Sequence, residues 1–274
     1  DFEYFAIDGK RLFVQSGDLR ISGGCSRTFR QKSFALKARN KYGDNEFKYP
    51  FFPNKFQTEY GGFFIRNSGN DQSSTMFRDA LLQSLIIGQM DIDYQAYQPT
   101  ALYINGAYWG IQNLREKVDA DYIKTNYGIE EDDIDLLEFN GVVIEGSANA
   151  YLSYLNGLNR INIEDSASFD YIAANIDVDE YINYMVTEIY YANTDWPGNN
   201  MKFWRQRSNG GKFRWILLDL DFGFDLNKSK PSGALHPTLE FATDPDQSEW
   251  PNPAWSTLHF RQVLKNPVFR SKFI

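Results

Sequence analysis

Cysteine and histidine are scarce in this sequence. Its 274 residues include one cysteine, Cys25, and two histidines, His236 and His259. A single cysteine excludes an internal disulfide and leaves the redox compartment undecided. Zinc sites are built mainly from Cys and His side chains. The scarcity of both residue types therefore argues against a zinc protein.

The sequence also lacks long apolar runs and an excess of basic residues. The longest apolar runs, such as LLQSLII at residues 81–87, are far shorter than the roughly 20 residues that span a bilayer. We therefore expect no membrane span. The net charge is −8, and because nucleic-acid binding depends on clustered basic residues, we expect no nucleic-acid partner.

What the chain does contain is enough apolar material for a large domain. Hydrophobic residues make up 42% of the sequence and aromatic residues 16%, which is typical of a folded protein with a sizeable core. The many Tyr, Trp, Asn and Gly residues favour a secreted or surface protein. The first residues show no signal-peptide pattern, and apolar residues still recur at helical spacing at the end. We expect a fragment of a longer protein, and the sequence does not decide its oligomeric state.

Residues 1–113 read as a strand-rich region. Strands are predicted where β-branched and aromatic residues lie between turn formers, namely at residues 11–15, 18–22, 33–38 and 61–68. Residues 40–55 are rich in turn formers and read as a long loop. Asn105-Gly106 lies between two further apolar segments and predicts a tight hairpin.

One helix is expected in this first region. Ser73 or Ser74 can cap it, and an apolar stripe follows at helical spacing, formed by Met76, Leu81, Leu82 and Leu85.

From residue 114 the pattern becomes mainly helical. Residues 117–128 and 179–193 are amphipathic, and Asp179 is expected to cap the second helix. Between them, residues 129–170 read as a variable acidic stretch. Residues 225–254 are rich in Pro, Ser and Asp and read as a loop.

Acidic and amide side chains meet at one end of a second predicted hairpin. Asn209-Gly210 favours a two-residue turn, so that paired residues have numbers summing to 419. Asn200 then lies opposite Asp219, and Asp219 shares a strand face with Asp221, since side chains alternate along a strand. Asp195 comes just before the first strand. A bulge near the turn would shift this register by one residue.

Two interpretations of these residues stay open. Asp and Asn are common in turns, and TDWPGNN at residues 194–200 is rich in turn formers. However, Asp219 and Asp221 end an apolar strand, where two like charges cost stability unless a cation or partner offsets them. Oxygen ligands of this kind suit Mg²⁺ or Mn²⁺.

An Asp, an Asn five residues later and a hairpin that ends in a metal-binding Asp are the arrangement of protein-kinase-like enzymes. The chain as a whole resembles the CotH family, the spore-coat protein H kinases. The likeness is carried by segments in matching order, ISGGCSRTFRQKSFAL, IRNSGNDQSSTMFRDALLQ, YINGAYWGIQNLREKVDADYI, TDWPGNNMKFWR and FRWILLDLDFGF.

The resemblance implies an α+β fold of the atypical protein-kinase type, with a single kinase-like domain over residues 1–274. Its two lobes would be a strand-rich N-terminal lobe, residues 1–113, and a mainly helical C-terminal lobe, residues 114–274, cut short at its C-terminal end. It also implies ATP and a divalent cation, Mg²⁺ or Mn²⁺, as cofactors. The implied substrates are Ser/Thr-rich proteins that are secreted or lie on the spore or cell surface.

The same resemblance assigns roles in the second lobe. Asp195 matches the catalytic aspartate, although Asn193-Thr194 replace the His-Arg that precede it in ordinary kinases. Asn200 and Asp219 match metal ligands, and Asp221 is a candidate for a second ion. The triplet Asp-Phe-Gly at residues 221–223 imitates the ordinary kinase motif, but the family match favours Asp219.

Nucleotide binding is assigned mainly to the first lobe. Lys32 matches a family lysine that would neutralise ATP phosphates, and Arg27 matches an arginine in the loop above them. Gly23, followed by Gly24, can bring backbone close to phosphate. Lys37 imitates the lysine of the ordinary kinase segment Val-Ala-Ile-Lys, but it lies at an odd spacing from Lys32 and therefore on the opposite strand face.

Further candidates follow from position. Glu116 and Asp119 lie where a kinase chain passes between lobes and meets the nucleotide, and they could equally be the charged start of a helix. Asp71, Arg78 and Asp79 lie at or in the first-lobe helix. That helix lacks the Glu that pairs with the kinase lysine, and Asp79 or Gln83 is a candidate substitute.

Three rival functions use the same residues differently. A pseudokinase would bind nucleotide without transfer. A glycosyltransferase would use Asp-Leu-Asp at residues 219–221 to hold a metal and a nucleotide. A non-catalytic surface or carbohydrate-binding module would stack sugars on the aromatic loops at residues 49–53, 195–198 and 248–256. Neither the glycosyltransferase nor the module explains the spacing of Asp195 and Asn200.

Overall fold

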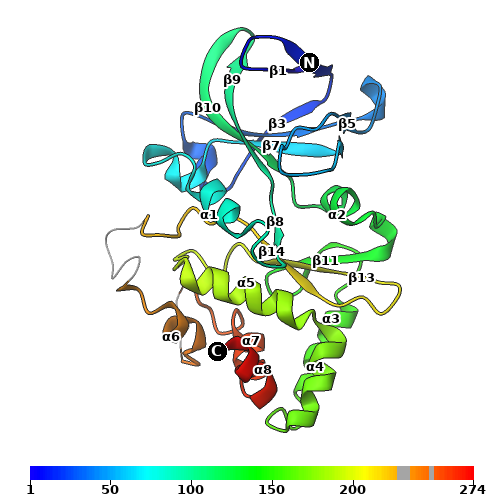
Figure 1. Ribbon diagram of the computed structural model, residues 1–274, viewed down its shortest axis with the longest axis vertical. Coiled ribbons are helices and arrows are strands. Elements are labelled where there is room, and N and C mark those ends of the chain that lie inside the picture. Colours follow the sequence, from blue (N-terminus) through cyan, green and yellow to red (C-terminus); the bar gives the residue numbers. More distant parts are fainter. Residues whose placement is uncertain (227–234, 247–249) are drawn as a thin grey trace. The chain divides into compact units, whose positions relative to one another are not determined.

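The computed structural model describes residues 1–226, 235–246 and 250–274. The chain divides into two compact units (Figure 1). Unit 1 contains Asp1–Ala80 and Gln95–Glu130, and unit 2 contains Leu81–Tyr94 and Glu131–Ile274. Helix α1 (Arg78–Ile86) crosses from the first unit into the second.

Unit 1 is built mainly from antiparallel strands. Its main sheet has the order β3-β4-β7-β10-β9, and two small sheets are β1-β2 and β5-β6. The elements are β1 (Phe2–Phe5), β2 (Arg11–Gln15), β3 (Asp18–Ser22), η1 (Cys25–Thr28), β4 (Ser33–Lys37), η2 (Asn40–Tyr42), β5 (Phe47–Lys48), β6 (Glu59–Tyr60), β7 (Gly62–Arg66), η3 (Gly69–Ser73), β9 (Tyr97–Ile104), β10 (Ala107–Glu116) and α2 (Ala120–Tyr127).

The first predicted hairpin is confirmed. Asn105 and Gly106 have φ angles of 50° and 78°, the left-handed values that a two-residue turn of this kind requires. Ala107 therefore pairs with Ile104, and β10 stays paired with β9 as far as Arg115 and Tyr97. The strands predicted at residues 11–15, 18–22, 33–38 and 61–68 also form.

The segment at residues 40–55 is more ordered than its composition indicates. It contains η2 and β5, and Phe47, Phe51 and Phe52 are fully buried in the core of unit 1. Phe47 stacks on Phe63 of β7, with ring centroids 5.5 Å apart. The prediction of a plain loop was wrong because it weighed the turn formers and not the apolar side chains between them, whose burial stabilises the unit.

Helix α1 begins later than predicted. Ser73 lies in η3, Ser74 follows it, and Met76 has a φ of 66°, outside the helical region. Leu82 and Ile86 are the buried apolar positions of the helix, whereas Leu81 and Leu85 are exposed. Of the predicted stripe, Leu82 is buried as expected, whereas Leu81 and Leu85 were wrong, since spacing of four residues places Ile86 on the same face as Leu82.

Unit 2 combines a mixed sheet with helices. The sheet has the order β12-β11-β13-β14-β8, and only β14 and β8 run parallel. The elements are β8 (Asp93–Tyr94), η4 (Glu131–Asp133), β11 (Ile134–Glu138), β12 (Val142–Glu145), α3 (Asn149–Leu158), η5 (Ser166–Ser168), α4 (Phe169–Asn175), α5 (Val178–Tyr190), β13 (Lys202–Gln206), β14 (Arg214–Leu217), α6 (Thr238–Thr243), α7 (Leu258–Val263) and α8 (Pro267–Phe273).

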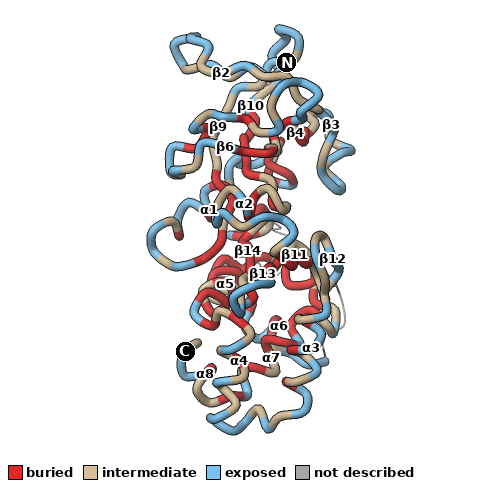
Figure 2. The backbone as a smooth tube through the Cα atoms, turned by 90° about the vertical axis from the view of Figure 1, so that its right-hand side faces the viewer, coloured by how far each residue is buried: buried red, intermediate tan, exposed pale blue. Residues whose placement is uncertain are grey.

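Helix α5 is the central helix of this unit. Buried positions run along it and along the strands that it covers (Figure 2). The Tyr181 ring packs on Trp215 of β14 at a centroid distance of 4.2 Å. The Trp215 backbone N–H donates to the buried Glu180 carboxylate at 2.9 Å. The apolar stripe of α5 therefore fixes the strand that leads to Asp219.

Three local predictions in unit 2 need correction. The acidic stretch at residues 129–170 contains β11, which is fully buried except at its last residue, together with β12 and α3. Helix α5 is capped by Asp177, whose carboxylate accepts the Glu180 N–H, and not by Asp179. The loop predicted at residues 225–254 contains α6, and parts of that loop lie outside the described residues.

The second hairpin forms with a different register. Asn209 and Gly210 have the predicted left-handed φ angles of 57° and 64°. The strands nevertheless pair Lys202 with Ile216 and Trp204 with Arg214, so paired numbers sum to 418. One extra residue on the first strand, between the turn and Trp204, accounts for the shift. β14 ends at Leu217, so the predicted shared strand face of Asp219 and Asp221 was wrong.

The fold class is α+β, as predicted. The kinase-like arrangement of two lobes and the single domain over residues 1–274 stay predictions. None of the helices in the described ranges is long and apolar enough to cross a membrane.

Candidate functional site

The predicted catalytic segment forms a compact turn between α5 and β13. The Asp195 carboxylate accepts hydrogen bonds at Oδ2 from the side-chain amides of Asn199, at 2.8 Å, and Asn200, at 3.2 Å. The indole N–H of Trp250 also donates to this carboxylate. The structure thus brings Asp195 and Asn200 together, as the sequence predicted, and adds Asn199 and Trp250.

Hydrogen bonds of buried side chains hold this turn in place. The Asp195 backbone N–H donates to the Asn193 side chain at 3.2 Å, and Asn193 donates to Glu188 of α5 at 2.9 Å. The Trp196 indole donates to the Tyr184 hydroxyl at 3.1 Å. All four anchoring residues are buried. A buried hydrogen bond is costly to lose, so these contacts fix the direction of the Asp195 side chain.

Asp195 and Asp219 are close enough to influence each other. Burial raises the pKa of Asp195, the negative charge of Asp219 raises it further, and the amides of Asn199 and Asn200 oppose the rise. Such repulsion between carboxylates is what a bound cation relieves. The oxygen donors of Asn200 and Asp219 are the kind that Mg²⁺ and Mn²⁺ prefer, so these residues fit a divalent cation.

Both of these residues have left-handed backbone. Asn200 has a φ of 55° and Asp219 a φ of 56°. Left-handed backbone is uncommon outside glycine, although Asn and Asp tolerate it best. Strained conformations persist where surrounding contacts impose them, and they cluster at functional sites. Other non-glycine residues of the chain also have positive φ angles, among them Asn105 and Asn209 in the hairpin turns, so the left-handed backbone is compatible with a site at Asn200 and Asp219 but does not single it out.

The described residues contain no group of three or more His, Cys, Asp or Glu side chains arranged to hold a metal ion. The candidate site at Asn200 and Asp219 differs from such a group, because one of its metal-binding atoms is the amide oxygen of an Asn. Asp221 is only 1% exposed. Its role as a ligand for a second ion stays a prediction.

In unit 1, Lys32 lies just before β4 and next to the Gly-rich turn. Its Nζ donates to the Arg27 backbone carbonyl at 2.6 Å, which ties β4 to η1. An ammonium has three N–H donors, so this bond leaves donors for a ligand. Gly23 has a φ of 112°, and a Cβ there would lie 2.3 Å from the Ser26 hydroxyl. The Arg27 side chain is exposed.

Lys37 and Glu116 have protein partners within unit 1. Lys37 forms an ion pair with Asp121 at 3.1 Å. Glu116 pairs with Lys55 at 3.4 Å, and both side chains are almost fully buried. Glu116 also accepts the Ala96 backbone N–H at 2.7 Å. The sequence reading missed Lys55, which comes from the segment at residues 40–55 that was read as a loop.

A comparison with known families supplies the decisive observation. The family model described as CotH kinase protein matches residues 19–274. The chain belongs to the CotH kinase family. A comparison with curated proteins finds no match. The match covers nearly the whole chain, so it supports a kinase-like function for the molecule and not for one segment alone.

Asp79 of this CotH-family chain pairs with arginines. It contacts Arg115 of β10 at 3.2 Å and Arg66 of β7 at 3.6 Å. The pair with Arg115 is buried, so it links α1 firmly to the sheet of unit 1. The sequence offered Asp79 as a partner of the nucleotide-binding lysine, and neither of these two contacts is with a lysine. Arg66 and Arg115 were not predicted as partners because they are distant from Asp79 in the sequence.

Asp71 and Asp119 act as local backbone caps. Asp71 is fully buried and accepts hydrogen bonds from the Thr75 hydroxyl, at 2.5 Å, and the Arg78 backbone, at 3.0 Å. Burial acts to raise the pKa of Asp71, but these hydrogen bonds outweigh it and leave the pKa lowered. Asp119 is the N-cap of α2 and accepts the Tyr122 N–H. Arg78 completes the first cap by donating through Nε to Asp71 at 3.2 Å.

Proposed function

We propose that the chain is a kinase that transfers the γ-phosphate of ATP to Ser or Thr hydroxyls of secreted or surface proteins, with a divalent cation. Membership of the CotH kinase family supports the reaction class. The observation that carries the proposal is the turn that sets the Asp195 carboxylate beside Asn199 and Asn200, within the influence of Asp219. Plain turn chemistry does not explain why Asp219 should approach this turn.

In this proposal Asp195 orients the acceptor hydroxyl. Its carboxylate accepts a hydrogen bond from the hydroxyl and takes the proton late, as the hydroxyl oxygen bonds to the γ-phosphorus. The bond from the γ-phosphorus to the bridging oxygen breaks, and ADP leaves. The amides of Asn199 and Asn200 keep the carboxylate in place, so that positioning accounts for much of the rate.

Asn200 and Asp219 are the residues that would hold the cation, with Asp221 as a candidate for a second one. A divalent cation bound there neutralises negative charge on the phosphates. Lys32, Arg27 and Gly23 would bind phosphate in unit 1, because a lysine ammonium acts as a compact positive charge. Glu116, Asp71 and Asp79 are buried in protein contacts and Asp119 caps α2, which favours structural roles for these four.

The rival functions are less well supported. A sugar-stacking module needs exposed rings, but Trp196, Phe51 and Phe52 are almost fully buried. Trp250 is exposed, and its indole N–H is bonded to the Asp195 carboxylate. A glycosyltransferase could use Asp219 and Asp221, but it leaves the turn that joins Asp195 to Asn199 and Asn200 unexplained. A pseudokinase shares the nucleotide site and differs only in the outcome of a transfer assay.

The test is a transfer assay with labelled ATP. The chain is incubated with Mg²⁺ or Mn²⁺ and a panel of Ser-rich secreted proteins, beside the Asp195→Ala variant. Label on a substrate with the parent chain, and its loss with the variant, is the expected result. ATP binding without transfer to any substrate would favour the pseudokinase. Neither binding nor transfer would contradict the proposal.

A further inference from the structure

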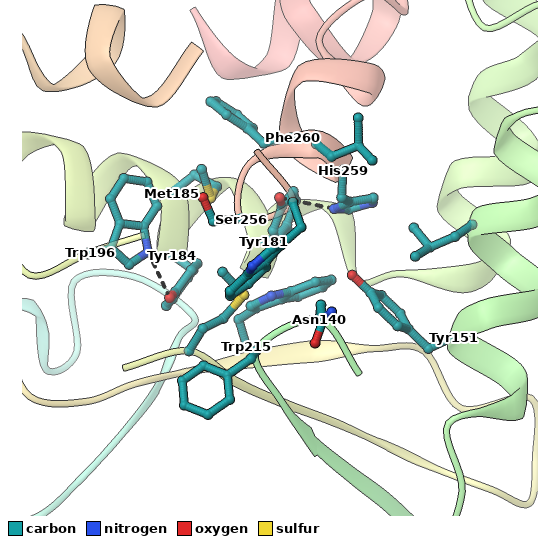
Figure 3. A pocket seen from close by; sticks show the side chains of 15 residues that line it. Asn140, Tyr151, Tyr181, Tyr184, Met185, Trp196, Trp215, Ser256, His259 and Phe260 are labelled. Carbon is teal, nitrogen blue, oxygen red and sulfur yellow. Dashed lines mark hydrogen bonds between the residues drawn. The ribbon is translucent and has the colours of Figure 1, made fainter. Parts of the chain in front are cut away.

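Unit 2 contains a cavity of about 100 Å³ beneath the catalytic turn. Figure 3 shows its walls, which are mostly aromatic rings and thioethers. Trp196, Trp215, Tyr181 and Phe260 form much of the lining, and each is almost fully buried. None of the lining side chains carries a formal charge at neutral pH.

Several polar groups in the wall are hydrogen-bonded within the protein. His259 contacts the Tyr154 hydroxyl through Nε2 at 2.8 Å and the Tyr181 hydroxyl through Nδ1 at 3.0 Å. Burial lowers the pKa of His259 to about 3, so its ring is neutral. The Trp196 indole is bound to Tyr184. A charged ligand would therefore lose its hydration without gaining an opposite charge.

The size of the cavity restricts its ligand further. Apolar cavities of about 150 Å³ stay dry and bind benzene or xenon, so this one suits a molecule no larger than a single ring. Flat aromatic walls favour a planar guest through edge and face contacts. Met185 and Met201 add sulfur–aromatic contacts and can adjust to its shape.

The cavity also has a route to solvent. Asn140 and Leu258 belong to its lining, and both are exposed, Leu258 by 46%. They mark its rim, whereas Tyr181 and Trp215 lie at its buried end. A small molecule can therefore enter without unfolding the core.

We propose that this cavity is a binding site for a small, neutral, apolar molecule of about the size of one aromatic ring. Because the cavity adjoins the catalytic turn, binding of a molecule there would affect that turn. Trp196 directly follows Asp195, Met201 directly follows Asn200, and both side chains line the cavity. A guest that moves either wall therefore moves the catalytic turn, and this consequence rests on the proposed kinase function.

Benzene is the probe for the binding test. Calorimetry should show saturable binding to the parent chain, and benzene should raise the melting temperature, since a ligand of the folded state stabilises it. Leu155→Trp places a larger side chain in the cavity wall and should weaken binding by at least about tenfold, equivalent to about 1.4 kcal/mol. Leu152→Trp is the matched control. It changes an exposed residue of the same helix, α3, outside the lining, and should bind like the parent.

A second pair covers the case in which Leu155→Trp fails to fold. Leu258→Trp enlarges a rim residue, and Leu239→Trp makes the same change at an equally exposed position on α6. Weaker or slower binding in the rim variant alone supports the site. The absence of saturable binding to the parent chain overturns it, as does unaltered binding in the folded rim and wall variants.

The transfer assay separates this site from the kinase proposal. Saturating benzene should change the transfer rate of the parent chain and leave Leu155→Trp unaffected. Benzene binding with an unchanged rate would overturn the coupling to the catalytic turn. Benzene binding in a chain that shows no transfer at all would count against the kinase function and leave the binding site standing.

Discussion

Asp195 and Asp219 have different surroundings, and the difference separates their predicted roles. Asp195 is held by Asn199 and Asn200, whereas Asp219 lies in strained backbone just beyond β14. Asp195→Ala should leave ATP·Mg²⁺ affinity nearly intact and lower transfer by about 10² to 10⁴, the usual contribution of a positioned acid–base group. Asp219→Ala should lose metal-dependent nucleotide binding together with transfer. Paired titration calorimetry and transfer assays measure both quantities.

The same pair of variants also tests the bland interpretation of the turn. If TDWPGNN is only a surface turn, both variants keep full activity and change stability slightly. That result would remove the kinase assignment for these residues.

The acid limb of the pH–rate profile should report on Asp195. A base must be ionised to accept a proton, and burial and Asp219 raise the pKa of this carboxyl above its ordinary value. Transfer should therefore rise with pH through that raised pKa. Asn199→Ala removes a hydrogen bond that lowers the pKa, so it should move the limb to higher pH. Asn156→Ala, at an exposed position on α3, should leave the limb where it is, and an unmoved limb in both variants would count against Asp195 as the base.

Lys32 and Lys37 offer a matched comparison within one short segment. Lys32 bonds to the turn around Arg27, whereas Lys37 pairs with Asp121 on the surface of unit 1. Lys32→Ala should weaken ATP binding and transfer, because a positive charge near phosphate is lost. Lys37→Ala should affect both much less. ATP titrations of the two variants decide, and the reverse order would mean that the ordinary kinase motif at Lys37 is the correct match.

At the scale of elements, caps explain acidic residues that the sequence offered as nucleotide ligands. Asp119 accepts the Tyr122 N–H at the start of α2. Asp119→Ala should lower the free energy of unfolding by about 1 kcal/mol, and Asp119→Asn should restore most of it, since Asn caps about as well as Asp. Denaturant unfolding measures the change. Restored stability without restored ATP affinity in the Asn variant would show that the charge of Asp119 also binds nucleotide.

The elements also show what the sequence alone could predict. Both Asn-Gly turns formed because their left-handed φ values depend on two adjacent residues. The register beyond the second turn differs by one residue, the shift that a bulge near the turn would produce, and the Asn-Gly pair alone does not specify such an extra residue. Asp195 and Asn200 met as predicted because five residues separate them. Contacts such as Lys55 with Glu116 join distant segments and leave no local pattern.

At the scale of the whole molecule, the family match spans residues of both units. We therefore expect binding of ATP and metal to change the thermal stability of the native chain. ATP with Mg²⁺ or Mn²⁺ should raise the melting temperature, because a ligand that binds only the folded state stabilises it by RT ln(1 + [L]/Kd), about 2.7 kcal/mol at 100 times Kd. A chelator should abolish the shift, and Asp219→Ala should show none, while Lys37→Ala should keep it. Differential scanning calorimetry measures all four cases. An equal shift with and without metal would mean that Asn200 and Asp219 do not bind nucleotide through a cation.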